Sequence, residues 1–178
     1  MNETQLSPIV RPARVVVGVT GSVGSGAALR RAVHEAQLLG ADLVPVLAWE
    51  PPGGEAVYRT APTPSLLTLW ERQAHERLDS AISAALGALP ADLHVEPLVV
   101  RAPVVHALTR LADRPTDLVV LGAGPRRPLA RLLRGKVRRG VAGRAQAPVL
   151  LVPPPTLPRS MRRELRKVTP EDFLRSAG

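Results

Sequence analysis

Short apolar runs alternate with amphipathic segments along this chain, and the alternation predicts strands and helices in turn. Apolar β-branched runs are typical of buried strands, whereas apolar residues three or four positions apart are typical of one helix face. The predicted strands are Arg14 to Val19, Leu43 to Trp49, Leu93 to Val100, Asp117 to Leu121 and Pro148 to Val152. The predicted helices are a segment from Leu29 to Leu39 closed by Gly40, a long helix after Ser65, about ten residues from Pro103, and a basic helix from about Gly135.

The long helix has the clearest inner face. Ser65 is its expected N-cap, because a Ser side chain can accept from the free N–H groups of a first turn. Its predicted inner stripe is Leu67, Trp70, Ala74, Leu78, Ala81, Ile82, Ala85 and Leu89. The helix after Pro103 is expected to bury Val104, Ala107, Leu108 and Leu111.

Prolines interrupt two of the predicted strands and one connection. Because Pro45 lacks an N–H, we expect it near the start of its strand. Pro97, within an alternating polar and apolar run, favours a strand at the sheet edge. The stretch from Glu50 to Ser65 is rich in Pro and Gly and is expected to be a mobile loop.

Strands separated by helical segments indicate βαβ units. Right-handed crossovers then give a doubly wound parallel sheet, an α/β fold that covers both faces with helices. Ligands of such sheets bind beyond the carboxyl ends of the strands. The loops at those ends are TGSVGSG, AWEPPGG and GAGPRRP, so their glycines and arginines predict an anionic guest of nucleotide size.

Composition and charge narrow the class of protein. The 178 residues suit one domain, and because only 2% are aromatic the core must be built from Ala, Val and Leu. The absence of Cys excludes disulfides and thiolate metal sites. No apolar run suits a signal peptide or a membrane-spanning helix, so we expect a soluble, cytoplasmic protein with no membrane partner.

The net charge of +9 is concentrated in one region. Residues 101–144 carry +9, residues 1–100 carry −3 and residues 145–178 carry +3. A focused positive field attracts phosphates, nucleic acid or acidic partners. The basic stretch from Arg159 to Lys167 has no aromatic residues on which bases could stack, so nucleic acid is not the favoured partner.

The other motifs give weaker evidence for a functional site. Gly135 and Lys136 do not form a P-loop, because Ala130 and Val137 stand where a Gly and a Ser or Thr are needed. The glycines at the end of the first strand lack the spacing of a dinucleotide fingerprint. The four His residues show no metal-ligand spacing, and no base accompanies the serines of the first loop, so we expect neither a metal site nor catalytic residues.

Five segments together resemble the universal stress protein family. VVVGVTGSVGSGAALRRAVHEAQLLGADL resembles the first strand and helix of its members, and VLAWEPP resembles the second strand, particularly of actinobacterial members. DLVVLGAG, RGKV and APVLLVPP resemble the closing half. The resemblance implies a five-stranded parallel sheet of order 3-2-1-4-5 and a domain over residues 14–153. Residues 1–13 are then an N-terminal extension and residues 154–178 a basic tail.

The family also implies an adenine-nucleotide site, because many members bind ATP through a G-x-x-G-x9-G-[ST] signature. Backbone N–H groups of the glycines approach the phosphates, and the last Gly and Ser open a helix. By position the implied site comprises Gly18, Val19, Thr20, Ala48, Gly122, Gly124, Pro125, Arg126, Gly135, Lys136, Val137 and Arg138.

This sequence keeps the spacing of that signature but changes its chemistry. Pro125 replaces the second glycine, Lys136 replaces the Ser or Thr, and Thr20 stands where the family usually has an Asp. One hypothesis is an adapted site, in which Lys136, Arg126, Arg127 and Arg138 hold phosphates by charge. The other is a nucleotide-free interaction module of the same fold.

In either case we expect a stress-response regulator rather than an enzyme, with a slow ATPase as a further possibility. Many family members dimerise through the last strand, and the apolar run from Pro148 to Val152 is expected to serve as such a dimer edge.

Overall fold

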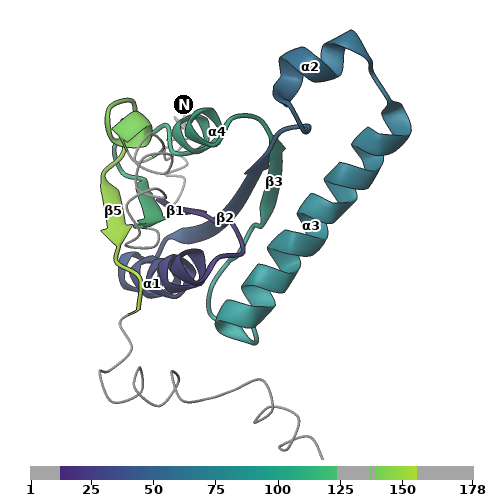
Figure 1. Ribbon diagram of the computed structural model, residues 1–178. Coiled ribbons are helices and arrows are strands. Elements are labelled where there is room, and N and C mark those ends of the chain that lie inside the picture. The colour runs from purple at the N-terminus through teal and green to yellow at the C-terminus, as the bar shows by residue number, and fades with distance from the viewer. Residues whose placement is uncertain (1–12, 124–136, 138, 156–178) are drawn as a thin grey trace, which may run out of the picture.

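The chain folds as a five-stranded parallel sheet with helices on both faces (Figure 1). This computed structural model describes residues 13–123, 137 and 139–155. The elements are β1 (Arg14–Gly18), α1 (Val23–Leu39), β2 (Asp42–Trp49), α2 (Gly54–Thr60), α3 (Pro64–Leu86), β3 (Leu98–Arg101), α4 (Val104–Leu111), β4 (Leu118–Gly122) and β5 (Val149–Val152). The strand order is β3-β2-β1-β4-β5, which confirms the predicted fold.

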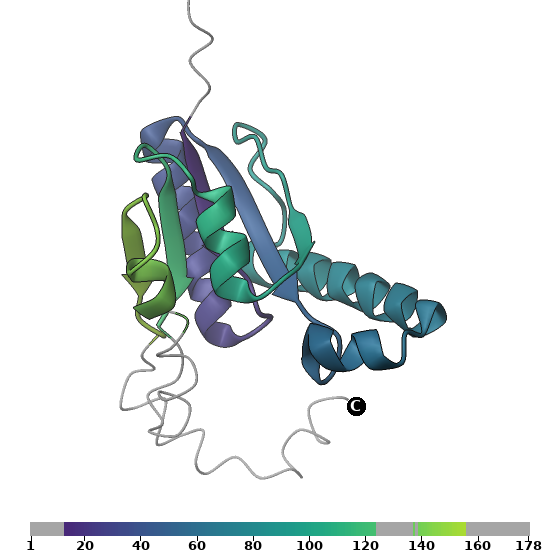
Figure 2. The ribbon, with the colours of Figure 1, turned by 90° about the horizontal axis from the view of Figure 1, so that it is seen from above.

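The two faces of the sheet are covered by different helices. Val15 and Val17 of β1 lie in a cluster with α1 and α3, whereas Val16 lies in a second cluster with α4 and Val141. This division follows from the period of two along a strand. Figure 2 shows α1 and α4 on opposite faces. Both faces of β1 are therefore buried, as its continuous apolar run predicts.

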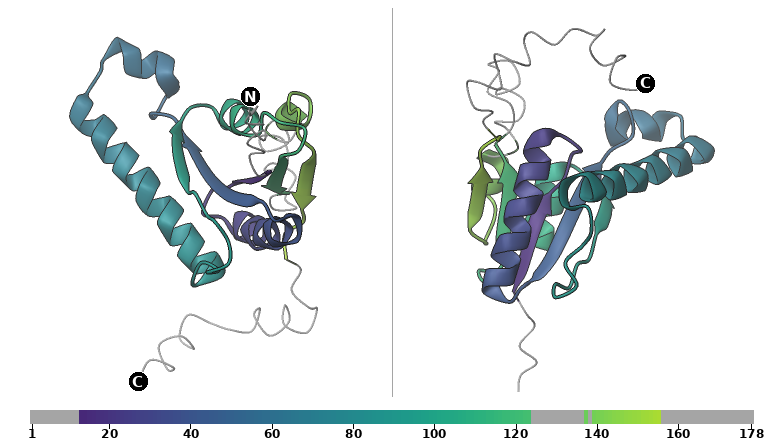
Figure 3. Two further views of the ribbon diagram at one scale, coloured as in Figure 1. Left: turned by 180° about the vertical axis from the view of Figure 1, so that it is seen from behind. Right: turned by 90° about the horizontal axis from the view of Figure 1, so that it is seen from below.

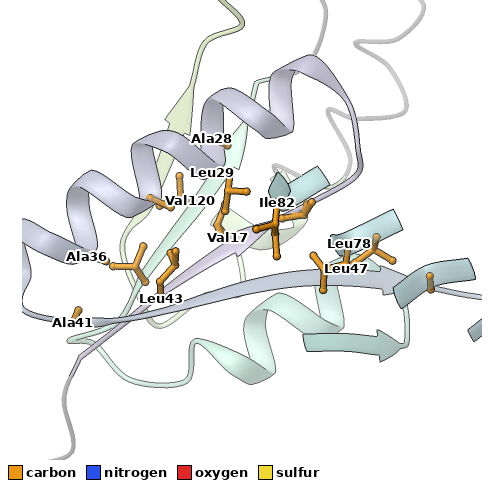
Figure 4. Close-up of a cluster of buried hydrophobic side chains, with 14 of the residues drawn as sticks. Val17, Ala28, Leu29, Ala36, Ala41, Leu43, Leu47, Leu78, Ile82 and Val120 are labelled. Atoms are coloured by element: carbon orange, nitrogen blue, oxygen red, sulfur yellow. The ribbon is translucent and has the colours of Figure 1, made fainter. Parts of the chain in front are cut away.

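The larger core cluster is almost wholly aliphatic (Figure 4). Leu29 of α1, Leu43 of β2 and Val120 of β4 are fully buried there. Ala74, Leu78 and Ile82 of α3 are buried at a spacing of four residues, which confirms the centre of the predicted stripe. Leu89 lies beyond the helix and is exposed, so its assignment to the stripe is wrong.

Helix α1 has a cap at each end. Ser22 is the N-cap, and its Oγ accepts from the N–H of Ser25 at 3.3 Å. Gly40 closes the helix at φ 58°, a left-handed conformation that glycine adopts readily, as the sequence predicts. Helix α3 differs from expectation, because Thr63 rather than Ser65 is its N-cap.

Three other expectations are corrected by the structure. The stretch from Glu50 to Ser65 is not a simple loop, because it contains α2 and the first residues of α3. Pro45 lies in the middle of β2, opposite Val17 of β1, rather than at the strand's start. Pro97 stands between an isolated bridge at Val95 and β3, so the third strand is shorter than predicted.

The amino end of the sheet is held by a buried carboxylate. Asp117, which is 1% exposed, accepts hydrogen bonds from Nη2 and Nε of Arg14 at 2.6 and 3.2 Å and from the N–H of Arg114 at 3.1 Å. The hydrogen bonds that Arg14 donates to Asp117 are the main cause of the raised pKa of Arg14. Arg14 in turn lowers the pKa of the exposed Asp113.

Candidate functional site

A small cavity lies at the carboxyl ends of β1 and β4, where a doubly wound sheet binds its ligands. Its volume is about 130 Å³. The described residues that line it are Gly18, Val19, Thr20, Ser22, Gly24, Ser25, Val46, Ala48, Val104, Leu108, Leu121, Gly122 and Val137. We call this cavity the switch-point pocket.

The glycines of the switch-point pocket are required by packing. A Cβ at Gly122 would lie 2.5 Å from the carbonyl oxygen of Gly24, so β4 and the first turn of α1 meet only because Gly122 has no side chain. A Cβ at Gly18 would lie 2.9 Å from Cδ2 of Leu121. Gly18 and Gly122 therefore line the pocket and are also required for close packing of the strands against their neighbours.

Hydroxyl groups border the pocket where β1 passes into α1. Oγ1 of Thr20 lies 3.0 Å from Oγ of Ser22, and Oγ of Ser25 donates to the carbonyl of Ser22 at 2.8 Å. Thr20 is exposed, whereas Ser25 is buried. The hydroxyl of the buried Ser25 therefore makes its hydrogen bond within the first turn of α1.

The lining of the pocket limits its chemistry. Among its described lining residues none carries a charge. Engineered apolar cavities of ~150 Å³ hold a benzene molecule, so a space of about 130 Å³ suits one flat ring system. The described part of the site can therefore hold an uncharged ring, with hydrogen bonds from Thr20 and Ser22 at its border.

The structure brings together all six predicted site residues that it describes. Gly18, Val19, Thr20, Ala48, Gly122 and Val137 all line the switch-point pocket. Gly124, Pro125, Arg126, Gly135, Lys136 and Arg138, together with Arg127, lie outside the described residues. The predicted phosphate-binding half of the site is therefore not described.

Some lining residues were not among the predicted site residues. Val104 and Leu108 belong to α4, and the sequence signal placed them in the core because they repeat at helical spacing. They do pack in the second core cluster, so one helix face serves both core and pocket. Val46 precedes the predicted Ala48 by two residues and faces the same side of β2.

A second, larger cavity lies on the other side of the β1–α1 turn. This groove has a volume of about 960 Å³, and its walls come from the end of β2, from Thr20 and Gly21, and from one face of α3. Trp49 and Trp70 both line it. Trp49 does not line the switch-point pocket. We call this cavity the α3 groove.

Other candidate chemistry is sparse in the described part of the chain. His94 lies 3.3 Å from a carboxylate oxygen of Asp42, as a surface pair. The described residues contain no group of three or more side chains suited to hold a metal ion. None of the described helices combines the length and the hydrophobicity that a membrane crossing requires.

The chain belongs to the universal stress protein family. The sequence model of that family matches residues 13–153, which include every described residue of the switch-point pocket. A search of curated proteins found no match.

Solved structures of the family share the fold. A universal stress protein crystallised in complex with cAMP is 30% identical, with a TM-score of 0.51; the match covers 82% of this chain and 99% of that one. The protein MJ0577 is 15% identical, with a TM-score of 0.63 and coverage of 83% and 100%. A universal stress protein from Archaeoglobus fulgidus in complex with dAMP is 20% identical, with a TM-score of 0.51 and coverage of 78% and 96%.

Proposed function

We propose that this protein is a stress-response regulator that binds ATP or a related adenine nucleotide in the switch-point pocket without catalysing a reaction. The observation that carries the proposal is the convergence of six predicted site residues on one ring-sized pocket at the carboxyl edge of the sheet, whose described lining is uncharged. The 30% identical relative crystallised with cAMP supports an adenine ring as the guest.

The described residues suit the base better than the phosphates. Gly18, Val19, Ala48 and Val137 would contact the ring, since all four line the pocket. The phosphates would need donors from elsewhere, because the described lining is uncharged. Lys136 and Arg126 are the proposed donors, since a cation can replace the hydroxyl and amide groups of the family signature.

Thermal unfolding with and without nucleotide tests this proposal. ATP, AMP and cAMP at about 100 times their Kd should each stabilise the protein by about 2.7 kcal/mol. Ala48→Leu should abolish the shift for all three, because its added carbons occupy the ring site. Lys136→Ala should weaken ATP more than AMP, because ATP places more phosphate charge near the missing cation.

A matched control separates ligand loss from unfolding. Ala102 is half-buried like Ala48 but does not line the described pocket, so Ala102→Leu should retain the nucleotide shifts. If no nucleotide shifts the unfolding temperature of the unmodified protein, the proposal is overturned. Phosphate release from ATP above background would contradict its non-enzymatic part.

A nucleotide-free dimeric interaction module is the second candidate function. It is favoured by Leu151, which is 44% exposed on the edge strand β5. This candidate expects a freshly purified protein that releases no nucleotide on denaturation. It also expects that stability is unchanged by Lys136→Ala.

A further inference from the structure

Helix α2 is weakly attached to the rest of the molecule. Figure 3 shows it beyond the end of the sheet that carries β3. None of the residues Gly54–Thr60, all of which the structure describes, is buried. Its N-cap is Gly53, which offers no side chain to the first turn. Packing and capping, the usual sources of helix stability, therefore contribute little here.

One arginine at the end of β3 supplies specific contacts that hold this helix. Nε of Arg101 lies 2.6 Å from Oε1 of Glu55, and Nη2 lies 2.9 Å from Oε2, a bidentate pair. The Arg101 guanidinium carbon also lies 4.9 Å from the centre of the Tyr58 ring. Arg101 thus binds two successive turns of α2, once through charge and once through an aromatic face.

Tyr58 also contacts Trp70, a residue that lines the α3 groove. The rings of Tyr58 and Trp70 meet edge to face, with 6.3 Å between their centres. Trp70 lines the groove from α3, and Trp49, the residue paired with Arg101 in the sheet register, lines it from β2. The position of α2 is therefore linked to one wall of the α3 groove through Tyr58.

We propose that Arg101, Glu55 and Tyr58 form a releasable latch that holds α2 and sets the position of Trp70 in the α3 groove. Side chains of Arg101 and Glu55 are 32% and 36% exposed, so water and salt reach the ion pair. When the pair is broken, α2 separates from β3 while the sheet and its core remain folded. The latch does not depend on nucleotide binding.

The charges around the latch set its response to acid. Arg101 lowers the pKa of Glu55, mainly through its hydrogen bonds, and Arg59 acts in the same direction. The hydrogen bonds to Glu55 raise the pKa of Arg101, and the charge of Glu71 acts in the same direction. A carboxylate with a depressed pKa contributes stability above its ordinary pKa and loses it as the pH falls through the lowered value. The latch is therefore closed at neutral pH and opens in acid.

Amide hydrogen exchange on the full chain tests the latch. Glu55→Gln and Arg101→Lys should each speed exchange in residues 54–60 by a factor of about two to five, the range for exposed ion pairs. Lys keeps the charge but cannot make the bidentate contact. Exchange in α4 should be unchanged. High salt should speed α2 exchange in the unmodified protein but have little effect in Glu55→Gln.

Glu71→Gln is the matched control, because Glu71 is an exposed carboxylate that acts on Arg101 through space. It should leave α2 exchange as it is. Glu55→Gln should also shift the tryptophan emission, and the shift should vanish when Trp70→Phe is added. Unchanged exchange in α2, or equal acceleration in α2 and α4, would overturn the latch.

Discussion

Two glycines at the carboxyl edge differ in what a single added carbon would meet. At Gly122 the obstacle is the backbone carbonyl of Gly24, which moves only if α1 moves. At Gly18 it is the end of the Leu121 side chain, which can change rotamer. A clash with backbone destabilises the fold more than a clash with the end of a side chain. Moving the backbone also displaces its neighbours, because the core around it is close-packed.

We therefore expect Gly122→Ala to lower the free energy of unfolding by about 1–3 kcal/mol, the range for an overpacked core. Gly18→Ala should cost less, because Leu121 can yield. Urea denaturation of the two variants measures the difference. Equal losses would contradict the role given to the Gly24 carbonyl.

A second prediction at the residue scale concerns Asp117. Asp117→Asn leaves Arg14 beside an amide that cannot accept all the same hydrogen bonds, so the unfolding free energy should fall by about 3 kcal/mol, as when one partner of a buried pair is removed. Asp113→Asn is the control, because Asp113 contacts the same Nη2 of Arg14 at 2.6 Å but its side chain is 62% exposed. Equal urea midpoints for the two variants would show that burial does not decide the effect.

At the scale of the element, helix capping distinguishes Ser22, which caps α1, from Ser65, which the sequence predicted to cap the long helix. Ser22→Ala should cost about 1 kcal/mol, because the first turn of α1 loses its cap. Ser65→Ala should change little, since Ser65 is exposed and the helix begins at Pro64. Thermal unfolding measures both. A larger loss in Ser65→Ala would mean that the assigned cap of α3 is wrong.

The elements were predicted well where the signal is local and poorly where it depends on neighbouring strands. Continuous apolar runs located β1, β2, β4 and β5, whereas the alternating run from Leu93 to Val100 overlaps β3 only in part. Pro45 was misplaced because its effect depends on its neighbours. The backbone N–H of Leu43 donates to His94 O, and its carbonyl accepts from the N–H of Glu96. The backbone of Pro45, two residues further along β2, faces the same neighbouring segment, so the position at which Pro45 lacks an N–H lies beside Pro97. The two prolines thus fall where the ladder of β2 and β3 is interrupted, which neither proline reveals alone.

At the scale of the whole molecule, the position of the site followed from topology. Gly18 and Gly122 are 104 positions apart in the chain, yet parallel strands bring them to the same edge. The contribution of α4 was missed, because Val104 and Leu108 look like any core stripe and only the packing of α4 against the sheet opens a pocket beside them. The α3 groove was missed for the same reason, since its walls come from three separate segments.

The edge strand β5 provides the last prediction, which concerns assembly. Leu150 and Val152 pack against the core of the domain, while Leu151 is 44% exposed on β5, the last strand of the sheet in the described part of the chain. A second copy pairing along β5 would cover Leu151 and satisfy the edge, and a charge placed there would remain buried without a partner. We expect Leu151→Glu to convert a dimer to a monomer in sedimentation velocity. Leu89→Glu is the matched control, because Leu89 is equally exposed but lies after α3. Loss of the dimer in both variants, or in neither, would mean that β5 is not the interface.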